Sequence, residues 1–330
     1  MTAPSGSAQP GGPHGAVSRR GIILFVAMSA IWGIPYLLIK VALQDLTPSF
    51  LVLARTAIGA AILLPLAVRR GLVRPALAHW RPLAAFAALE IAVPWFLVGD
   101  AERHMPSSLA GLLIATVPLI GSLVAWRLGD ATAVTGVRLV GLAVGMVGVA
   151  AVVGLDLSSG TTPLAVAEIL LVSVGYATAP IIAARHLSQV PTLGIIAVSL
   201  AAVAVLYSPA AILARPHAMP RPSVLASVLA LAVVCTALAF LLFFALIGEI
   251  GPVRATVITF VNPAVAVTLG VVVLGEHFTA GIAIGFPLVL LGSWLATRKP
   301  GAAPAAEVPI QAQPQPTRAT SRGARFRPPR

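Results

Sequence analysis

Long apolar runs separated by short polar breaks are the feature that most constrains this chain. Of its 330 residues, 58% are apolar and only 10% are charged, with a mean hydropathy of +0.97. A typical soluble chain is charged at about a quarter of its positions, so a soluble globular domain is excluded. Lipid cannot satisfy backbone polar groups, and a helix of about 20 apolar residues crosses the hydrocarbon core. The sequence therefore predicts an all-α polytopic membrane protein.

Ten apolar runs of 18 to 25 residues meet this length requirement. The segments outside them, residues 1–18 and 300–330, are rich in Pro, Gly, Ala, Gln and Ser. We expect two disordered tails there, the second one basic, because such segments cannot bury a core. The predicted spans are 21–39, 48–68, 82–99, 106–126, 137–155, 164–184, 193–213, 223–247, 252–274 and 280–297.

The distribution of positive charge predicts the orientation in the membrane. If the N-terminus is cytoplasmic, only Lys40, Arg103, Arg215 and Arg221 of the 22 Lys and Arg residues fall on the outer side, and Arg55 lies within a span. Cytoplasmic loops carry an excess of Lys and Arg. We therefore expect a multi-pass protein of the inner or plasma membrane with both termini in the cytoplasm. Topology explains the net charge of +12 better than nucleic-acid binding does.

The second half of the sequence repeats the first. Spans four and five align with spans nine and ten at an offset of 144 to 146, which places Pro118 on Pro263 and Asp130 on Glu276. With five spans per half, the second half lies inverted in the membrane. Inverted repeats are typical of secondary transporters, whose substrate site lies near the midplane between the halves. Each proline removes a backbone donor, so we expect helix kinks that either line a cavity or only shape packing.

The first two spans contain Trp32-Gly33, Lys40 and Arg55. Together with the duplicated module, these residues form a characteristic pattern. The pattern resembles the EamA family of the drug/metabolite transporter superfamily. The resemblance implies ten transmembrane helices as two inverted five-helix repeats, residues 19–155 and 156–299. It also implies export or exchange of small metabolites through a central cavity. One departure is Asp130, which stands where the family usually has Glu.

Ionisable side chains within spans mark candidate functional residues, because each costs at least about 2.5–3.5 kcal/mol at mid-bilayer. Glu90 lies in the middle of the third span, where it binds a substrate amine, carries a coupling proton, or is a protonated structural carboxyl. Arg55, eight residues into the second span, holds a substrate carboxylate or pairs with Glu90. Glu168 lies near the outer end of the sixth span, where its carboxylate can also reach the headgroup region.

Aromatic and amide side chains complete the candidate site. Trp32 and Tyr36 share one helix face at a spacing of four, and Tyr176 stands at the aromatic position of the family. Thr259 and Asn262 lie three residues apart before the proline of the ninth span, with interhelical hydrogen bonding as the alternative role. The residues that we predict to bind substrate or couple transport are Glu90, Arg55, Trp32, Tyr36, Tyr176, Thr259, Asn262 and Glu168.

These observations predict a secondary transporter that moves an amino acid or a related small metabolite by alternating access, with export favoured by the resemblance. A drug or organic-cation exporter is the first alternative. A membrane-embedded enzyme acting on lipid-linked substrates is the second, with Asp100, Glu102 and His104 as its cluster. Metal-ligand spacings and phosphate-binding loops are missing from the sequence, so we expect no catalytic residues, metal, cofactor or nucleic acid. Expected partners are the substrate, membrane lipid and protons; glycine-spaced packing leaves a homodimer open.

Overall fold

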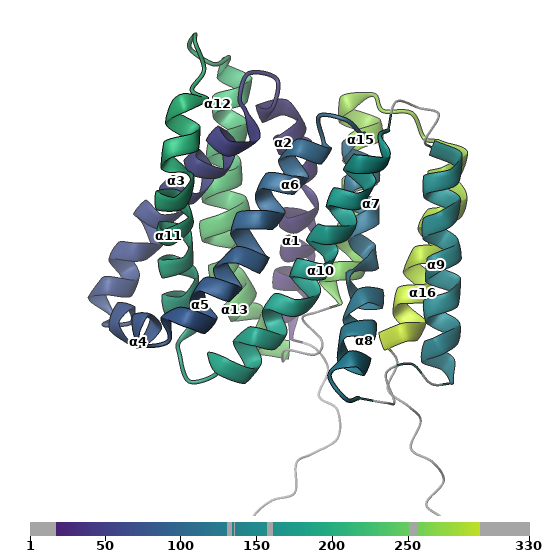
Figure 1. The fold of residues 1–330 in the computed structure, drawn as a ribbon, viewed down its shortest axis with the longest axis horizontal. Coiled ribbons are helices and arrows are strands. Elements are labelled where there is room, and N and C mark those ends of the chain that lie inside the picture. The colour runs from purple at the N-terminus through teal and green to yellow at the C-terminus, as the bar shows by residue number, and fades with distance from the viewer. Residues whose placement is uncertain (1–17, 131–133, 135, 157–160, 251–256, 298–330) are drawn as a thin grey trace, which may run out of the picture. The chain divides into compact units, whose positions relative to one another are not determined.

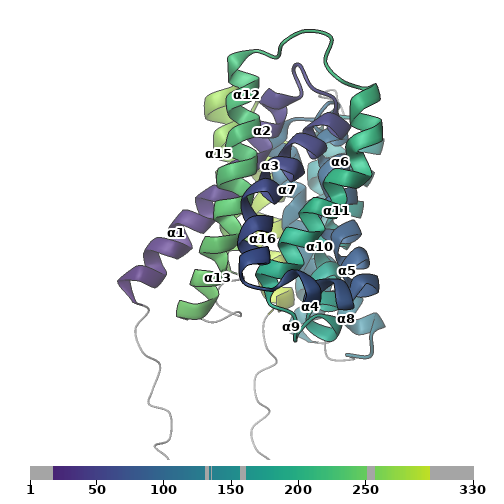
Figure 2. The same cartoon turned by 90° about the vertical axis from the view of Figure 1, so that its left-hand side faces the viewer.

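A computed structural model of the chain shows a bundle of helices (Figures 1 and 2). The structure describes residues 18–130, 134, 136–156, 161–250 and 257–297. No β-strand occurs in these segments, which confirms the predicted all-α class. Within them, nine helical spans of 18 to 29 residues are long and apolar enough to cross a bilayer, and Ile258–Leu274 is a shorter apolar helix. The predicted tails lie outside the described residues, apart from Ser18.

Several spans consist of shorter helices joined end to end. The elements of the first half are α1 (Arg19–Gly33), α2 (Pro35–Ala42), α3 (Pro48–Arg69), α4 (Val73–Ala78), α5 (Trp80–Ala87), η1 (Ala88–Ala92), α6 (Val93–Ala101), α7 (Ser107–Leu113), η2 (Ile114–Thr116), α8 (Val117–Arg127) and α9 (Val137–Asp156). Those of the second half are α10 (Pro163–His186), α11 (Thr192–Leu213), α12 (Pro222–Leu229), η5 (Ala230–Leu238), α13 (Ala239–Ile250), α15 (Ile258–Leu274) and α16 (Ala280–Thr297). Most observed ends lie within two residues of the predicted ones.

The two repeat-related prolines have different local surroundings. Pro118 is the second residue of α8, which follows a single 3₁₀ turn, η2. The backbone N–H that proline lacks is therefore missing in the first turn of α8, where it would have no partner within the helix. Pro263 lies inside α15, which continues through it. The duplicated proline therefore coincides with an interrupted helix in the first half but not within the described part of the second.

A contact between the halves shows that repeat-related spans run in opposite directions. Glu276 follows α15, and its carboxylate accepts hydrogen bonds from the backbone N–H groups of Ser107 (2.7 Å) and Ser108 (2.9 Å) at the start of α7. Because α15 ends where α7 begins, these two spans are antiparallel, as inverted repeats require. The carboxylate also satisfies helix N-terminal donors that would otherwise lack partners in the membrane.

Lys40 also stabilises the turn between α6 and α7, which precedes Ser107. Its ammonium, near the end of α2, donates to the backbone carbonyls of Glu102 and of Met105, at 2.8 Å for Met105. A cation on the carbonyls and an anion on the amides thus fix the turn between α6 and α7. We call this end of the bundle the Lys40 end, and the end that carries Arg20 at the start of α1 the Arg20 end.

The last spans of the two halves, α9 and α16, lie side by side with their backbones in contact (Figure 1). A Cβ added at Gly292 of α16 would lie 2.7 Å from the carbonyl oxygen of Gly141 in α9. One added at Gly148 would lie 2.7 Å from the backbone nitrogen of Val289. The glycine spacing of α9 therefore serves packing within one chain, where small residues let membrane helices approach closely.

Replacing Gly292 by alanine tests this packing. We expect Gly292→Ala to lower the free energy of unfolding by about 1–3 kcal/mol, because the added methyl group forces the two backbones apart. Gly154→Ala is the matched control on α9, since no atom lies within 4 Å of a Cβ at that position. Thermal unfolding of both variants in one detergent measures the difference. Equal unfolding temperatures for the two would contradict close α9–α16 contact.

Candidate functional site

Arg55 lies at the centre of the most distinctive polar site in the bundle. It sits midway along α3 with only 8% of its surface exposed. Its guanidinium carbon lies 3.6 Å from the ring centroid of Trp95 on α6, a cation–π geometry. Its Nε donates a 2.9 Å hydrogen bond to the Thr236 hydroxyl oxygen on η5. Arg55 therefore joins two spans of the first half to one span of the second.

A π-helical segment explains why Thr236 can receive Arg55. Within η5, the Thr236 hydroxyl donates to the carbonyl of Leu231, five residues earlier, at 2.8 Å. This bond satisfies a carbonyl of the widened helix and leaves the hydroxyl oxygen free to accept from Arg55. The corresponding third span has its own π-helical segment, η1, which carries Glu90. Glu90 and Thr236 are 146 positions apart, within the offset of the repeat.

Glu90 has no ion-pair partner among the residues that the structure describes. Its Oε2 atom is buried and makes no hydrogen bond. α10 approaches η1 closely at Gly175, where a Cβ would lie 2.5 Å from the Leu89 carbonyl oxygen. This approach brings Tyr176 near enough for the charges of both Glu90 and Arg55 to act on it. π-Helical segments recur at functional sites because they reposition side chains and free backbone groups.

Arg55 and Glu90 do not form the ion pair that sequence analysis left open. Every ion pair recorded between described residues lies near an end of the bundle, away from Arg55. These are Arg20–Glu249 (3.2 Å), Arg103–Asp100 (3.2 Å), Arg138–Asp130 (3.9 Å) and Arg221–Asp45 (2.7 Å). The guanidinium of Arg55 is thus a buried cation without an acidic partner in the part of the chain that the structure describes.

Two tyrosines lie near this cation in addition to Trp95. Tyr36 on α2 lies close enough for the charge of Arg55 to act on it, and it has Tyr176 as a further neighbour. We call Arg55, Trp95, Thr236, Tyr36 and Tyr176 the Arg55 cluster. Trp32 lies one turn before Tyr36 in sequence but packs on a separate group of rings. Its own lies 4.7 Å from that of Phe243 and 6.2 Å from that of Phe240, between centroids.

Three other predicted residues lie apart from the Arg55 cluster. With its amide oriented to satisfy its surroundings, Asn262 donates to the carbonyls of Ile258 (2.9 Å) and Ser29 (3.0 Å), which ties α15 to α1. Thr259, on the same helix, is half-buried. Glu168 lies toward the Lys40 end, near enough to Asp100 for the charge of Asp100 to act on it.

The three residues considered for an enzyme do not converge on one surface. Glu102 is fully buried, with neither carboxylate oxygen hydrogen-bonded. His104 is exposed, and Asp100 pairs with Arg103 at 3.2 Å. Within the described residues, no group of three or more His, Cys, Asp and Glu side chains could hold a metal ion.

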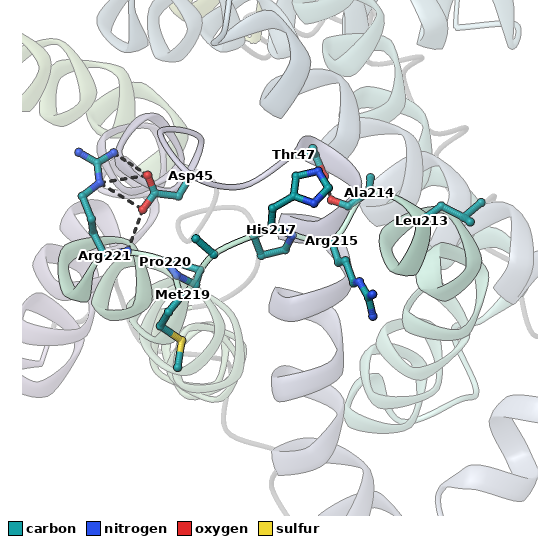
Figure 3. A pocket seen from close by; sticks show the side chains of 11 residues that line it. Asp45, Thr47, Leu213, Ala214, Arg215, His217, Met219, Pro220 and Arg221 are labelled. Atoms are coloured by element: carbon teal, nitrogen blue, oxygen red, sulfur yellow. Dashed lines mark hydrogen bonds and ion pairs between the residues drawn. The ribbon is translucent and has the colours of Figure 1, made fainter.

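A pocket of about 520 Å³ lies outside the Arg55 cluster, at the Lys40 end, under the loop between α11 and α12 (Figure 3). There the Arg221 guanidinium donates to Asp45 at 2.7 Å and 3.0 Å, and the Arg221 backbone N–H donates at 2.8 Å. These hydrogen bonds lower the pKa of Asp45 and raise that of Arg221. A second pocket of about 480 Å³ is an almost wholly apolar groove between α3 and α11. Neither pocket is lined by the cluster.

Sequence reasoning missed Trp95 and Thr236, and it considered Glu102 only as part of a cluster with Asp100 and His104 for the enzyme alternative. The sequence could have indicated Thr236, because the repeat offset makes it the equivalent of Glu90 in the second half. For Glu102 the signal is its spacing: Pro94, Val98 and Glu102 are separated by four residues each, and all three are buried. Trp95 had no such signal, because one aromatic residue in an apolar span does not reveal which neighbour it faces.

Known proteins resemble this chain over nearly its whole length. The EamA-like transporter family matches residues 19–154 and 164–298. The uncharacterized inner membrane transporter YedA of Escherichia coli (strain K12) is 29% identical over 303 residues, which cover 87% of this chain and 96% of YedA. The uncharacterized transporter YvbV of Bacillus subtilis (strain 168) is 23% identical over 294 residues, covering 88% and 96%.

The fold also matches a solved crystal structure with a TM-score of 0.58 and 21% identity, over 84% of this chain and 96% of the other. Two matched repeats, the antiparallel contact through Glu276 and the apolar helices agree with one another. They point to a transporter rather than to an enzyme. The chain is a multi-pass membrane transporter that belongs to the EamA-like transporter family.

Proposed function

We propose that this protein exports a small amphipathic metabolite that bears a carboxylate, an amino acid or a close relative, by alternating access of its two halves. The observation that carries the proposal is the unpaired cation of Arg55. A buried charge in a membrane span costs about 2.5–3.5 kcal/mol or more, and stacking on Trp95 offsets up to about 2 kcal/mol. A substrate carboxylate would supply the missing counter-charge through two parallel hydrogen bonds.

The surroundings of Arg55 support a substrate that is partly apolar. Trp95, Tyr36 and Tyr176 present ring surface beside the cation, which suits an aliphatic or aromatic side chain. Glu90 provides a second polar group of opposite sign, and Tyr176 lies near enough to both groups for their charges to act on it. A zwitterion with its carboxylate at Arg55 and its amine at Glu90 satisfies both unpaired groups together.

The placement of charge supports a cytoplasmic location for both termini. Lys40, Arg103 and Arg221 lie at the Lys40 end, whereas Arg20 and Arg69 lie at the opposite end. We therefore propose that the Lys40 end faces the exterior of the cell membrane and that the Arg20 end faces the cytoplasm. Export then moves substrate from the Arg20 end towards the Lys40 end.

Exchange measurements with Arg55 variants test carboxylate binding. In proteoliposomes loaded with unlabelled amino acids, we expect Arg55→Gln to slow counterflow of radiolabelled amino acids at least about tenfold, because a charge-assisted hydrogen bond contributes about 1.5–3 kcal/mol. Amino acid amides lack the carboxylate, so they should compete poorly with radiolabelled amino acids for the wild type. For the variant, the amides and the acids should compete equally well. Arg20→Gln, which removes an exposed charge at the bundle end, is the matched control.

The gel-filtration profile separates a binding defect from misfolding. If Arg55→Gln folds like the wild type and still distinguishes acids from amides, Arg55 does not bind the carboxylate. If Arg55→Lys, which keeps the charge, restores the distinction while Arg55→Gln loses it, the role of the cation is supported.

Glu90→Gln tests the amine contact. We expect the wild type to prefer an amino acid over its deaminated analogue and the variant to transport both at similar rates, because the amide carries no charge to attract an ammonium group. Glu249→Gln, at the exposed end of α13, controls for loss of any carboxylate. An export of tetraphenylphosphonium that requires Glu90, with no amino acid counterflow, would replace this proposal by the organic-cation exporter.

A further inference from the structure

The turn between α6 and α7 contains a buried carboxyl group that the Arg55 cluster does not use. Glu102 has 0% of its surface exposed, and both carboxyl oxygens lack a hydrogen-bond partner. An ionised carboxylate accepts several hydrogen bonds, and burying it without them is far more costly than burying the neutral acid. The surroundings of Glu102 therefore favour the protonated carboxylic acid.

The contacts of the neighbouring charged residues also favour the protonated form of Glu102. The charge of Lys40 acts on Glu102, but the Lys40 ammonium donates to the backbone carbonyls of Glu102 and Met105 instead of to the Glu102 carboxylate. The charge of Glu276 also acts on Glu102. The two carboxylate oxygens of Glu276 accept hydrogen bonds from the backbone N–H groups of Ser107 and Ser108, which stabilise its charged form. Two carboxyl groups close together in different surroundings adopt different charge states, one anionic and one neutral.

The titration of Glu102 follows from these contacts. Burial raises the pKa of the Glu102 carboxyl well above its usual range, Lys40 lowers it, and the Glu276 carboxylate raises it. Glu102 lies just outside the span Trp80–Ala101 and next to the exposed residues Arg103 and His104. A modest opening of this turn would therefore bring the carboxyl group into contact with water.

Tyr36 links this turn to the Arg55 cluster. It lies on α2 one helical turn before Lys40, close enough for the charges of both Arg55 and Glu102 to act on it. Opening of the turn to water and occupation of Arg55 by a substrate therefore act on one shared neighbour. This proximity gives the charge state of Glu102 a physical route to the candidate substrate site.

We propose that Glu102 is the proton-binding site that couples transport to the pH gradient, with Lys40 as the charge that replaces the proton. In the closed turn Glu102 holds the proton on its carboxyl oxygen. When the turn opens at the Lys40 end, the O–H bond breaks and the proton passes to water. The carboxylate that remains is neutralised by the ammonium of Lys40, which leaves the two backbone carbonyls. Coupling rests on the proposed export function, whereas the protonation of Glu102 does not.

Infrared spectroscopy of the reconstituted full-length protein tests the protonation without any substrate. We expect a carboxylic-acid C=O band that persists at neutral pH and is lost in Glu102→Gln, an amide of nearly the same shape as the neutral acid. Asp45→Asn is the matched control at the same end of the bundle, because the Arg221 contact lowers the pKa of Asp45 and keeps it ionised. A neutral-pH spectrum unchanged by Glu102→Gln would overturn the proposal.

The pH dependence of stability gives a second readout without substrate. A carboxyl whose pKa is raised on folding binds more protons in the folded state than in the unfolded one, so stability falls as pH rises above the unfolded pKa. The wild type should therefore lose thermal stability relative to Glu102→Gln on going from acidic to neutral pH. Asp45→Asn keeps Glu102 and should show at least the same loss relative to Glu102→Gln. Parallel curves for the wild type and Glu102→Gln would contradict a proton on Glu102.

Transport in proteoliposomes tests the coupling. With a gradient of about one pH unit and one proton exchanged per substrate, the wild type should accumulate radiolabelled amino acid roughly tenfold. We expect Glu102→Gln to retain counterflow but to lose this accumulation, whereas Asp45→Asn retains both. Accumulation in Glu102→Gln equal to that of the wild type would overturn coupling through this residue. If the wild type carries no amino acid, the export proposal fails, and the infrared band alone decides whether Glu102 holds a proton.

Discussion

The cation of Arg55, buried among apolar helices, is the interaction on which the arrangement around it depends. A guanidinium at this depth is tolerated only where rings and oxygen atoms replace water, and the chain supplies Trp95 from one span and Thr236 from another. Thr236 belongs to the second half of the sequence, so the hydrogen bond from Arg55 forms only when the two halves are in contact. The residue that we propose to bind the substrate carboxylate therefore also links the two halves.

The sequence predicted the spans well, because the thickness of a bilayer fixes the length of an apolar run. It also predicted the inversion, since an odd number of spans per repeat leaves no other arrangement. It was harder to predict which side of each helix faces the interior of the bundle and which faces lipid. A membrane helix has lipid or protein on every side, so apolar residues cover its whole circumference and give no reliable period. Asn262 was predicted for the substrate site from its spacing with Thr259, with interhelical hydrogen bonding as the alternative. Its amide hydrogen-bonds α15 to α1, which corresponds to that alternative.

Repeat symmetry and sequence divergence make different contributions to the candidate site. The third and eighth spans both contain a π-helical segment at equivalent positions, so the duplicated architecture supplies the widened backbone twice. The side chains then differ: Glu90 stands in one copy and Thr236 in the other. Thr236 satisfies a carbonyl of its own helix and accepts from Arg55, whereas Glu90 retains an unpaired oxygen. The repeat thus provides the two widened helical segments. The sequence difference between the copies then gives a polarised site, with the Arg55 cation near η5 and the Glu90 acid on η1.

The same division applies to the acidic residues at the Lys40 end. Glu276 belongs to the duplicated module and acts on the backbone of the other half, where two amide donors fix its charge. Glu102 has no acidic equivalent at the repeat offset and makes no such bond. An acid that caps a helix must stay ionised for the halves to hold together, so it is poorly suited to carrying a proton. An acid outside the module, buried beside a lysine that bonds elsewhere, can change its charge without breaking that contact. In this bundle, the structural charge and the titrating charge are therefore best carried by different residues.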